Sequence, residues 1–97
     1  SKVPDILSEL KTFGIDAIIH DPLANADEAV HEYGLKLTPL DEFKKLDALI
    51  FAVSHKKYIE MGPSKLLSHV KDGGVFVDVK SALDSSKMER GIRYWSL

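Results

Sequence analysis

Polar side chains that can bind a ligand follow three apolar segments of the chain, at the points where those segments end. These residues are His20-Asp21, Ser54-His55, Asp78, Lys80 and Ser81. In an open parallel sheet the carboxyl ends of the strands meet at one edge, and ligands bind outside that edge. The sequence therefore predicts a ligand-binding edge formed by these residues.

Asp78 and Lys80 form the most informative pair of this set. Asp78 lies inside an apolar strand and Lys80 just beyond it, so the alternation of a strand predicts both side chains on one face. A lysine at a strand end near helix N-termini can bind a phosphate as a point charge. An ion pair between Asp78 and Lys80 with no ligand is the alternative interpretation.

Two histidines, His20 and His55, stand at the predicted strand ends. Such residues serve in acid–base chemistry or metal binding, but a single histidine at a strand end is more often a structural hydrogen-bonding residue. The four histidines of the chain have no H-x-x-x-H or H-x-H spacing. The sequence therefore does not favour a metal site, and it leaves the roles of His20 and His55 open.

Motifs for cofactor binding and covalent catalysis are missing from these 97 residues. The sequence has neither G-x-G-x-x-G nor G-x-x-x-x-G-K-[ST], and its glycines stand at predicted caps and turns. With no cysteine, the segment has no disulfide, thiolate metal site or thiol nucleophile. Ser54 and His55 are adjacent and have no evident third member, so they do not indicate a catalytic triad.

Helices and strands are predicted to alternate along the chain. Residues 2–13 have helical spacing and stop at Gly14; residues 15–20 are β-branched and apolar; Asn25 caps a helix that stops at Gly34. The inner face of that helix is predicted to be Ala26, Ala29, Val30 and Tyr33.

The alternation continues in the second half. A short edge strand is predicted at Leu35–Leu37, followed by a helix from Thr38-Pro39 through Leu46 and a central strand at Ala48–Val53. Next come a helix that is capped by Ser54 and interrupted at residues 61–63, and a turn at residues 72–74. The last two predicted elements are strands, at Val75–Val79 and Ile92–Leu97. The phenylalanines Phe13, Phe43, Phe51 and Phe76 are predicted to pack in the core, and so is the pair Tyr94-Trp95.

Strands that are apolar on both faces and alternate with helices are typical of a parallel sheet covered on both sides. We therefore expect one domain over residues 1–97 with a three-layer α/β/α Rossmann-like fold and a mostly parallel sheet. A domain of this class normally begins with a strand, whereas a helix comes first here. We expect the first strand to precede Ser1 in a longer chain.

Composition limits the partners. The net charge is −2 with interleaved signs, so no basic surface for nucleic acid is expected. The longest apolar run, Ala48–Val53, is far shorter than the ~18 residues of a membrane helix, so no membrane span is expected. A cytoplasmic location fits the absence of cysteine.

The ordered motifs GIDAIIHDP, EYGL, DALIFAVSH, GGVFVDVKSALD and GIRYWSL resemble the C-terminal domain of the UDP-glucose and GDP-mannose dehydrogenases. The histidine after the apolar strand (His55) and the Tyr94-Trp95 ending are most similar to the UDP-N-acetylhexosamine 6-dehydrogenases of bacterial polysaccharide biosynthesis. This resemblance covers essentially the whole chain.

The resemblance implies a UDP-sugar ligand and a cofactor, NAD, that an N-terminal domain binds. It also implies a catalytic cysteine in a central helical region, a homodimer, and oxidation of the sugar C6 alcohol to a carboxylate. On this basis residues 1–97 alone are inactive and depend on the rest of their own chain. Lys80 matches the family's basic residue at the UDP-sugar site, and Asp78 is expected to orient it. Many members have arginine there. The lysine at position 80 can still pair its charge with a phosphate, but it is not expected to make the bidentate contact of an arginine.

Two other functions remain open on the sequence alone. One is a non-enzymatic α/β interaction or regulatory module, for instance a receiver-like domain, although the central strand ends in Val53-Ser54-His55 and not in an aspartate. The other is a surface that serves mainly for dimerisation. The sequence does not determine which UDP-sugar is bound, the oligomeric state of the fragment, or whether the fragment alone binds UDP.

Overall fold

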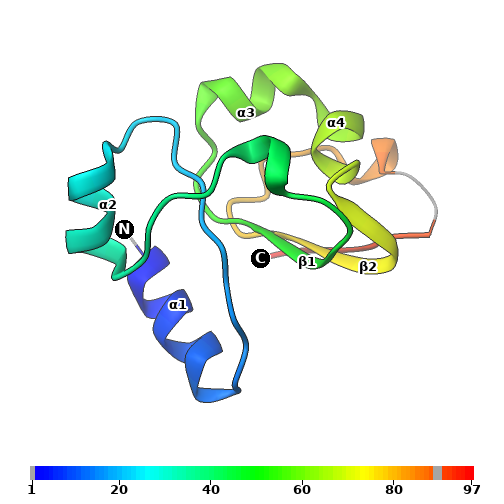
Figure 1. The fold of residues 1–97 in the computed structure, drawn as a ribbon. Coiled ribbons are helices and arrows are strands. Elements are labelled where there is room, and N and C mark those ends of the chain that lie inside the picture. Colours follow the sequence, from blue (N-terminus) through cyan, green and yellow to red (C-terminus); the bar gives the residue numbers. More distant parts are fainter. Residues whose placement is uncertain (1, 89–90) are drawn as a thin grey trace. The chain divides into compact units, whose positions relative to one another are not determined.

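A computed structural model describes residues 2–88 and 91–97 of the chain (Figure 1). The chain divides into two compact units, Ser1–Glu42 and Phe43–Leu97. The first unit contains two helices and the second a parallel sheet with helices. The predicted α/β class with a parallel sheet is confirmed.

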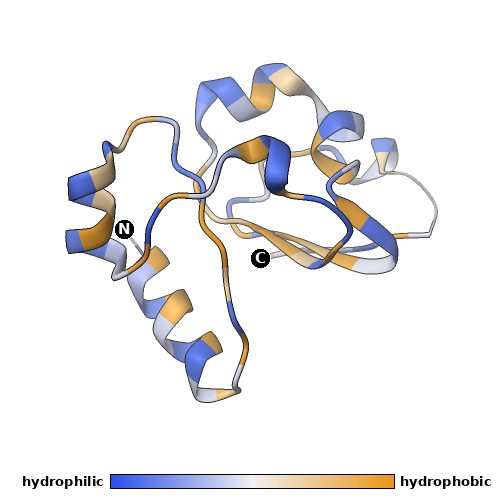
Figure 2. Cartoon of the chain, in the orientation of Figure 1, coloured by the Kyte–Doolittle hydropathy of each residue, from blue (hydrophilic) through white to orange (hydrophobic). Residues whose placement is uncertain are grey.

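The first unit begins with α1 (Val3–Thr12), as predicted. Proline in its first turn is preset for a helix start, while Asp5 and Lys11 complement the helix dipole at its two ends. The helix stops before Gly14, which has a φ of +71°. Apolar and polar residues alternate around α1 at helical spacing, so that it is amphipathic (Figure 2).

The second helix of this unit is α2 (Ala26–Tyr33). Its predicted caps are confirmed, because the Asn25 side chain accepts a hydrogen bond from the Glu28 amide at 2.8 Å and Gly34 is left-handed. The predicted inner face is only partly right: Ala29 is fully buried, but Ala26 and Val30 are exposed. An eight-residue helix has little more than two turns, so only a narrow stripe of it is covered.

The predicted strand at residues 15–20 does not form a ladder. Within the described residues, only Ile19 pairs, in an isolated parallel bridge with Leu37, and the Thr38 amide donates to the Ile19 carbonyl oxygen at 2.7 Å. The predicted edge strand at Leu35–Leu37 is likewise reduced to this bridge. Apolar composition favours an extended chain, but a strand also needs a partner along its length.

The predicted helix from Thr38 through Leu46 is wrong. The structure has only the 3₁₀ turn η1 (Leu40–Glu42), and Lys45 has a φ of +49°. A left-handed residue cannot continue a right-handed helix, so the chain turns there and enters the first strand at Leu46. Leu40, Phe43 and Leu46 have helical spacing in the sequence, but they do not share a helix. Leu40 lies in η1, Phe43 in the segment that follows it, and Leu46 is the first residue of the strand.

The sheet of the second unit consists of β1 (Leu46–Phe51), β2 (Val70–Asp78) and β3 (Arg93–Ser96), in that order and all parallel. The central and last predicted strands are present, with β1 beginning and ending two residues earlier than expected. The predicted turn at residues 72–74 is wrong, because these residues belong to β2. They form the irregular stretch where the β1–β2 register shifts, and Gly73 supplies the positive φ of +79° that it requires.

Two short helices, α3 (Lys56–Met61) and α4 (Pro63–Leu67), connect β1 to β2 and cover one face of the sheet (Figure 1). His55, and not the predicted Ser54, is the N-terminal cap residue of α3, and it makes no side-chain capping bond. The break predicted at residues 61–63 is confirmed at Gly62. A second 3₁₀ turn, η2 (Ser85–Lys87), follows β2.

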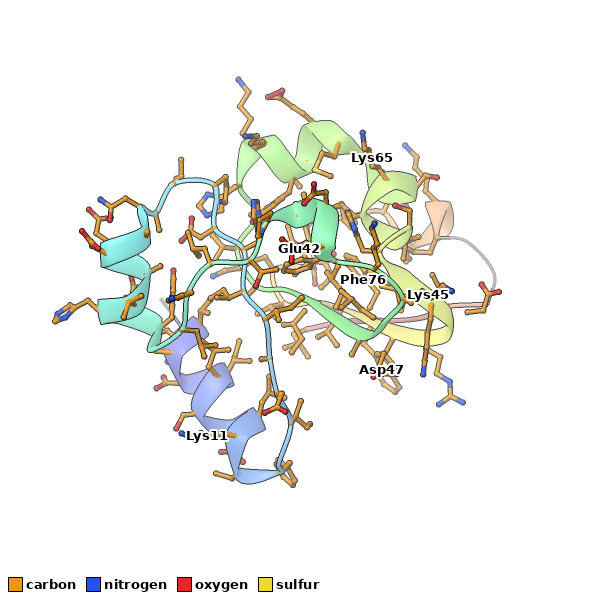
Figure 3. All side chains as sticks on the ribbon, viewed as in Figure 1. Lys11, Glu42, Lys45, Asp47, Lys65 and Phe76 are labelled. Atoms are coloured by element: carbon orange, nitrogen blue, oxygen red, sulfur yellow. The ribbon has the colours of Figure 1, made fainter. Side chains whose placement is uncertain are left out.

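One hydrophobic core lies between this sheet face and the helices. Its buried members are Phe51, Leu66, Leu67, Val70 and Phe76. Phe76, labelled in Figure 3, is completely buried at its centre.

The predicted packing of the aromatic residues is partly confirmed. Phe43, Phe51 and Phe76 are buried, but Phe13 is 73% and Trp95 62% exposed. Register explains Trp95: Tyr94 is opposite Phe76 and faces the core, so its neighbour Trp95 must point to the other face. Phe13 is the C-terminal cap residue of α1, beyond its last turn.

Substitution of Gly74 tests the close packing of β1 against β2. A Cβ atom at this position would lie 2.5 Å from Val70 Cγ1, 2.9 Å from the Lys71 carbonyl oxygen and 3.0 Å from that of Asp47. Two of these neighbours are backbone, so we expect Gly74→Ala to lower the free energy of unfolding by about 1–3 kcal/mol in urea denaturation.

The control is Gly14→Asn, because nothing lies within 4 Å of a Cβ there and asparagine tolerates the left-handed conformation. We expect little change in this control. A Gly74→Ala variant as stable as the wild type would show that the strands do not approach as closely as described.

Candidate functional site

The carboxyl ends of the three strands share one edge of the sheet. Phe51 is paired with Asp78, and Asp78 is paired with Ser96, so the three strands end level with one another. The segments that follow β1 and β2 leave the sheet at this edge. The structure therefore brings together the predicted site residues of the second unit, Ser54-His55, Asp78, Lys80 and Ser81, at one edge, while His20-Asp21 belong to the first unit.

Asp78 is the only polar or charged residue among the described residues that is fully buried. Its Oδ1 accepts a hydrogen bond from the Ala82 amide at 3.0 Å. Its Oδ2 accepts one from the Leu83 amide at 2.9 Å and one from the Tyr94 hydroxyl at 2.6 Å. A carboxylate without water needs such donors, because an unpaired buried charge is very costly.

These hydrogen bonds attach the loop after β2 to the sheet. The backbone turns sharply at Ser81, whose φ is +51° and whose amide donates to the Asp78 carbonyl oxygen at 3.2 Å. The Ser81 hydroxyl donates to the Leu97 carbonyl oxygen at 2.6 Å. Asp78 and Ser81 together fix the path of residues 79–83, and Lys80 lies within that path.

Lys80 is exposed, and the described residues place no acidic partner within ion-pairing distance of it. The ion pair with Asp78 that the sequence suggested is not formed. The alternation that put both side chains on one face holds only within a strand, and β2 ends at Asp78. The fixed loop thus presents an ammonium group to solvent at the carboxyl edge of the sheet, where an anion can reach it.

His55 is half-buried at the start of α3, and its ring lies 5.8 Å from that of Tyr58 with a tilt of 56°. A second histidine, His69, directs Nδ1 to the Phe43 carbonyl oxygen at 2.7 Å. The His69 contact joins two segments that are distant in sequence, whereas the His55 contact lies within the first turn of α3.

Tyr94 is the residue of this edge that sequence reasoning missed, since it was assigned to the core only for its ring. Burial, followed by the hydrogen bond to Asp78, raises the pKa of Tyr94 from 10.0 to about 12. Side chains alternate in direction along a strand, so Tyr94 and Trp95 must lie on opposite faces of the sheet. This alternation is the sequence signal that could have identified Tyr94.

The first unit contains a similar set of hydrogen bonds to an aspartate carboxylate. Asp21 Oδ1 accepts from the Leu23 and Ala24 amides, and its Oδ2 accepts from the Tyr33 hydroxyl at 2.8 Å. Burial and this bond raise the pKa of Tyr33 to about 12. Asp21 therefore acts as a local anchor for the turn before α2.

The residues at the carboxyl edge do not fit NAD in the manner of a Rossmann dinucleotide site. The segment between β1 and α3, Ala52–His55, has no glycine, and α3 is only six residues long. Within residues 2–88 and 91–97, the structure shows no cluster of three or more metal-ligating side chains. The same residues include no helix long and apolar enough to span a membrane.

The chain matches the UDP-binding domain of the UDP-glucose/GDP-mannose dehydrogenase family over residues 1–85. The chain belongs to this family. Protein CapL of Staphylococcus aureus is 35% identical over 97 residues, which are 100% of this chain and 23% of that protein.

Two relatives are named UDP-N-acetyl-D-glucosamine 6-dehydrogenase. The Pseudomonas aeruginosa protein is 33% identical over 89 residues and the Salmonella typhi protein 31% over 91 residues, in each case 92% of this chain and 21% of the relative. This UDP-binding domain thus spans about a fifth of the length of these relatives.

The buried hydrogen bond between Tyr94 and Asp78 is testable with a matched pair of variants. Tyr94→Phe removes a donor from a carboxylate that water cannot reach, so we expect a loss of about 1–3 kcal/mol in the free energy of unfolding in urea. Tyr33→Phe removes the equivalent donor from the half-buried Asp21, where water can take its place, and should cost less. Equal losses in the two variants would contradict the special burial of Asp78.

The raised pKa values of Tyr33 and Tyr94 predict the alkaline behaviour of the UDP-binding domain. Because the folded state holds both tyrosines neutral, their contribution to stability is complete below pH 10 and is lost as the pH rises toward about 12. Tyrosinate absorbance in the folded protein should show two of the three tyrosines ionising near pH 12, and only one in Tyr94→Phe. Ionisation of all three near pH 10 would refute this.

Proposed function

We propose that residues 1–97 bind the UDP part of a nucleotide sugar within a longer, NAD-dependent 6-dehydrogenase that acts on a UDP-N-acetylhexosamine or UDP-glucose in bacterial polysaccharide biosynthesis. The main support is the family match over residues 1–85 together with the fixed loop that presents Lys80 at the carboxyl edge of the sheet. The two relatives named UDP-N-acetyl-D-glucosamine 6-dehydrogenase favour an N-acetylhexosamine as the sugar.

In this proposal Lys80 contacts the diphosphate. Its ammonium is exposed, has no acidic partner among the described residues, and follows a parallel strand at the edge where ligands of such sheets bind. A lysine binds phosphate as a point charge and places few demands on geometry. Charge pairing with a diphosphate is therefore the interaction that it can supply.

Asp78 serves the same site indirectly. Both of its carboxylate oxygens are occupied by hydrogen bonds inside the protein and the residue is fully buried, so it is a positioning residue for the loop that carries Lys80. The same burial argues against a receiver-like module, in which an aspartate must accept a phosphoryl group from outside.

The chemistry of the whole enzyme requires groups from outside these residues. Conversion of a C6 alcohol to a carboxylate removes two hydrides, which are accepted by two NAD, and adds one oxygen atom from water. This chain has no cysteine and no glycine-rich dinucleotide motif, so the nucleophile and the NAD site are assigned to the rest of the polypeptide. We further propose that the intact enzyme is a homodimer, as the resemblance implies, and that it is cytoplasmic.

The role of Lys80 is tested by Lys80→Ala in the intact enzyme. Loss of a charge-assisted contact should weaken UDP-sugar binding by about 1–3 kcal/mol, or roughly 10- to 100-fold in KM, with a smaller effect on kcat. Lys80→Arg should restore most of the affinity because it keeps the charge.

The control is Lys56→Ala, which removes an exposed lysine that pairs with Glu60 on the outer side of α3. This variant should bind UDP-sugar like the wild type. Unchanged KM and kcat in Lys80→Ala would show that Lys80 does not contact the UDP-sugar. The family assignment would stand, but no residue at this edge would be assigned to ligand binding.

A further inference from the structure

The loop that carries Lys80 is closed by a ring of hydrogen bonds at the carboxyl edge of the sheet. The Asp78 carbonyl oxygen accepts from two amides, that of Ser81 at 3.2 Å and that of Leu97 at 3.3 Å. The Ser81 hydroxyl donates in turn to the Leu97 carbonyl oxygen at 2.6 Å. These bonds join the end of β2, the loop and the residue after β3 in a closed cycle, and Lys80 lies within the loop that the cycle closes.

The backbone of Lys80 is held from both sides. Before it, the Val79 amide donates to the Phe51 carbonyl oxygen of β1 at 3.1 Å. After it, Ser81 is bound to Asp78 and to Leu97 by the cycle. The exposed ammonium therefore moves only as far as its own side chain allows, as long as these bonds are formed.

Ser81 has a backbone conformation that serine rarely adopts. Its φ is +51°, and within residues 2–88 and 91–97 the other non-glycine residue with a positive φ is Lys45. Glycine reaches this region readily, whereas a residue with a side chain is strained there. Serine adds the hydroxyl that donates to Leu97, which glycine lacks. Strained residues are concentrated at functional sites, so the strain and the hydroxyl together indicate that the loop conformation matters for function.

The strand that receives these bonds has few other attachments. β3 has four residues, three of them exposed, and among the described residues β2 is its only strand partner. Its remaining residue, Tyr94, donates its hydroxyl to Asp78 Oδ2 at 2.6 Å. Short, exposed edge strands open more easily than the centre of a sheet. The docking of β3 therefore depends on the contacts of Tyr94 and Leu97 with the Lys80 loop and its base.

We propose, building on the proposed function, that Ser81 and Tyr94 are positioning residues for UDP-sugar binding. By holding the Lys80 loop and β3 together, they couple the docking of this strand to the binding of the diphosphate at Lys80. A loop that is fixed before the ligand arrives loses less conformational entropy on binding, and its ammonium stays within reach of the phosphate. The lysine side chain is itself flexible, so the expected effect is smaller than that of losing the charge.

Neither hydroxyl serves as a further phosphate ligand in this arrangement. A hydroxyl has one hydrogen to donate, and that of Ser81 is directed to the Leu97 carbonyl oxygen. The Tyr94 hydroxyl is likewise directed to the fully buried Asp78. An anion is bound by donors, so neither group can donate to it while the loop is closed. Both residues therefore act through Lys80.

A double-mutant cycle in the intact enzyme tests this assignment, with UDP as the probe and calorimetric titration as the measurement. We expect Ser81→Ala to raise the Kd for UDP by about 3- to 10-fold, the usual range for one hydrogen bond. In the Lys80→Ala background the same change should alter the Kd by less than about twofold, because no ammonium is left to position. Equal fold-changes in the two backgrounds, or an unchanged Kd in Ser81→Ala alone, would overturn the inference.

A second variant and a matched control complete the cycle. Tyr94→Phe should also raise the Kd for UDP, and only where Lys80 is present; a purely structural role would lower stability and leave the Kd of the folded enzyme unchanged, which would overturn the assignment. The control, Ser68→Ala, removes an exposed hydroxyl that donates to the Lys65 carbonyl oxygen near the opposite end of β2. It should bind UDP like the wild type. A loss as large as that of Ser81→Ala would also contradict the inference.

The coupling must act in the reverse direction as well, because linkage is reciprocal. Saturating UDP should slow hydrogen exchange of the Leu97 amide, which donates to Asp78, by about 3- to 10-fold, and this slowing should be absent in Lys80→Ala. Unchanged exchange in the wild type would show that β3 and the ligand are not coupled.

The inference and the proposed function fail in different ways. If Lys80→Ala weakens UDP binding and Ser81→Ala does not, the positioning role is wrong and the proposed function stands. If the wild-type enzyme does not bind UDP, both are overturned.

Discussion

The carboxylate of Asp78 is the interaction on which the described edge of the sheet depends. Because the residue is completely buried, its charge must be satisfied by donors from the protein, and three donors converge on it. They come from the loop after β2 and from β3, so one charge joins segments that are separated in sequence. Lys80, the proposed phosphate contact, lies between these fixed points and is exposed.

The same physical solution appears in each unit. Asp21 and Asp78 each follow or end an apolar segment, each accepts two backbone amides a few residues on, and each accepts a tyrosine hydroxyl from a later element. A short side chain at the end of an extended segment can reach the amides of the next turn, while the tyrosine closes the turn against a helix or strand. The two residues differ in burial. Asp78 is fully buried, so only protein donors can satisfy its carboxylate, whereas water can reach the half-buried Asp21.

The second unit encloses a hydrophobic core of its own. α3, α4 and one face of the sheet enclose Phe51, Leu66 and Phe76, and these contacts lie within residues 43–97. The opposite face carries Ile50, Val77 and Trp95 in one register row, outside that core cluster. Of these three side chains only Trp95 is exposed, at 62%, whereas Ile50 and Val77 are partly buried.

Local sequence determined the elements whose stabilising groups are close along the chain. The caps of α2 at Asn25 and Gly34 and the stop of α1 at Gly14 act over a few residues, and they were predictable because the required residue types are specific. The apolar runs of β1 and β2 were recognisable for the same reason. So was the set of polar residues at strand ends, which placed Asp78 and Lys80 among the candidates.

Only the tertiary structure decided what depends on partners distant in sequence. Residues 15–20 had the composition of a strand, yet pairing is a property of two segments, and only Ile19 found a partner. Lys45 and Gly73 changed local direction in ways that spacing could not reveal. Asp78 binds Tyr94 and not Lys80 because the strand ends at Asp78 and β3 brings the hydroxyl to it. Sequence thus determined which groups are available, and the strand pairing determined which of them meet.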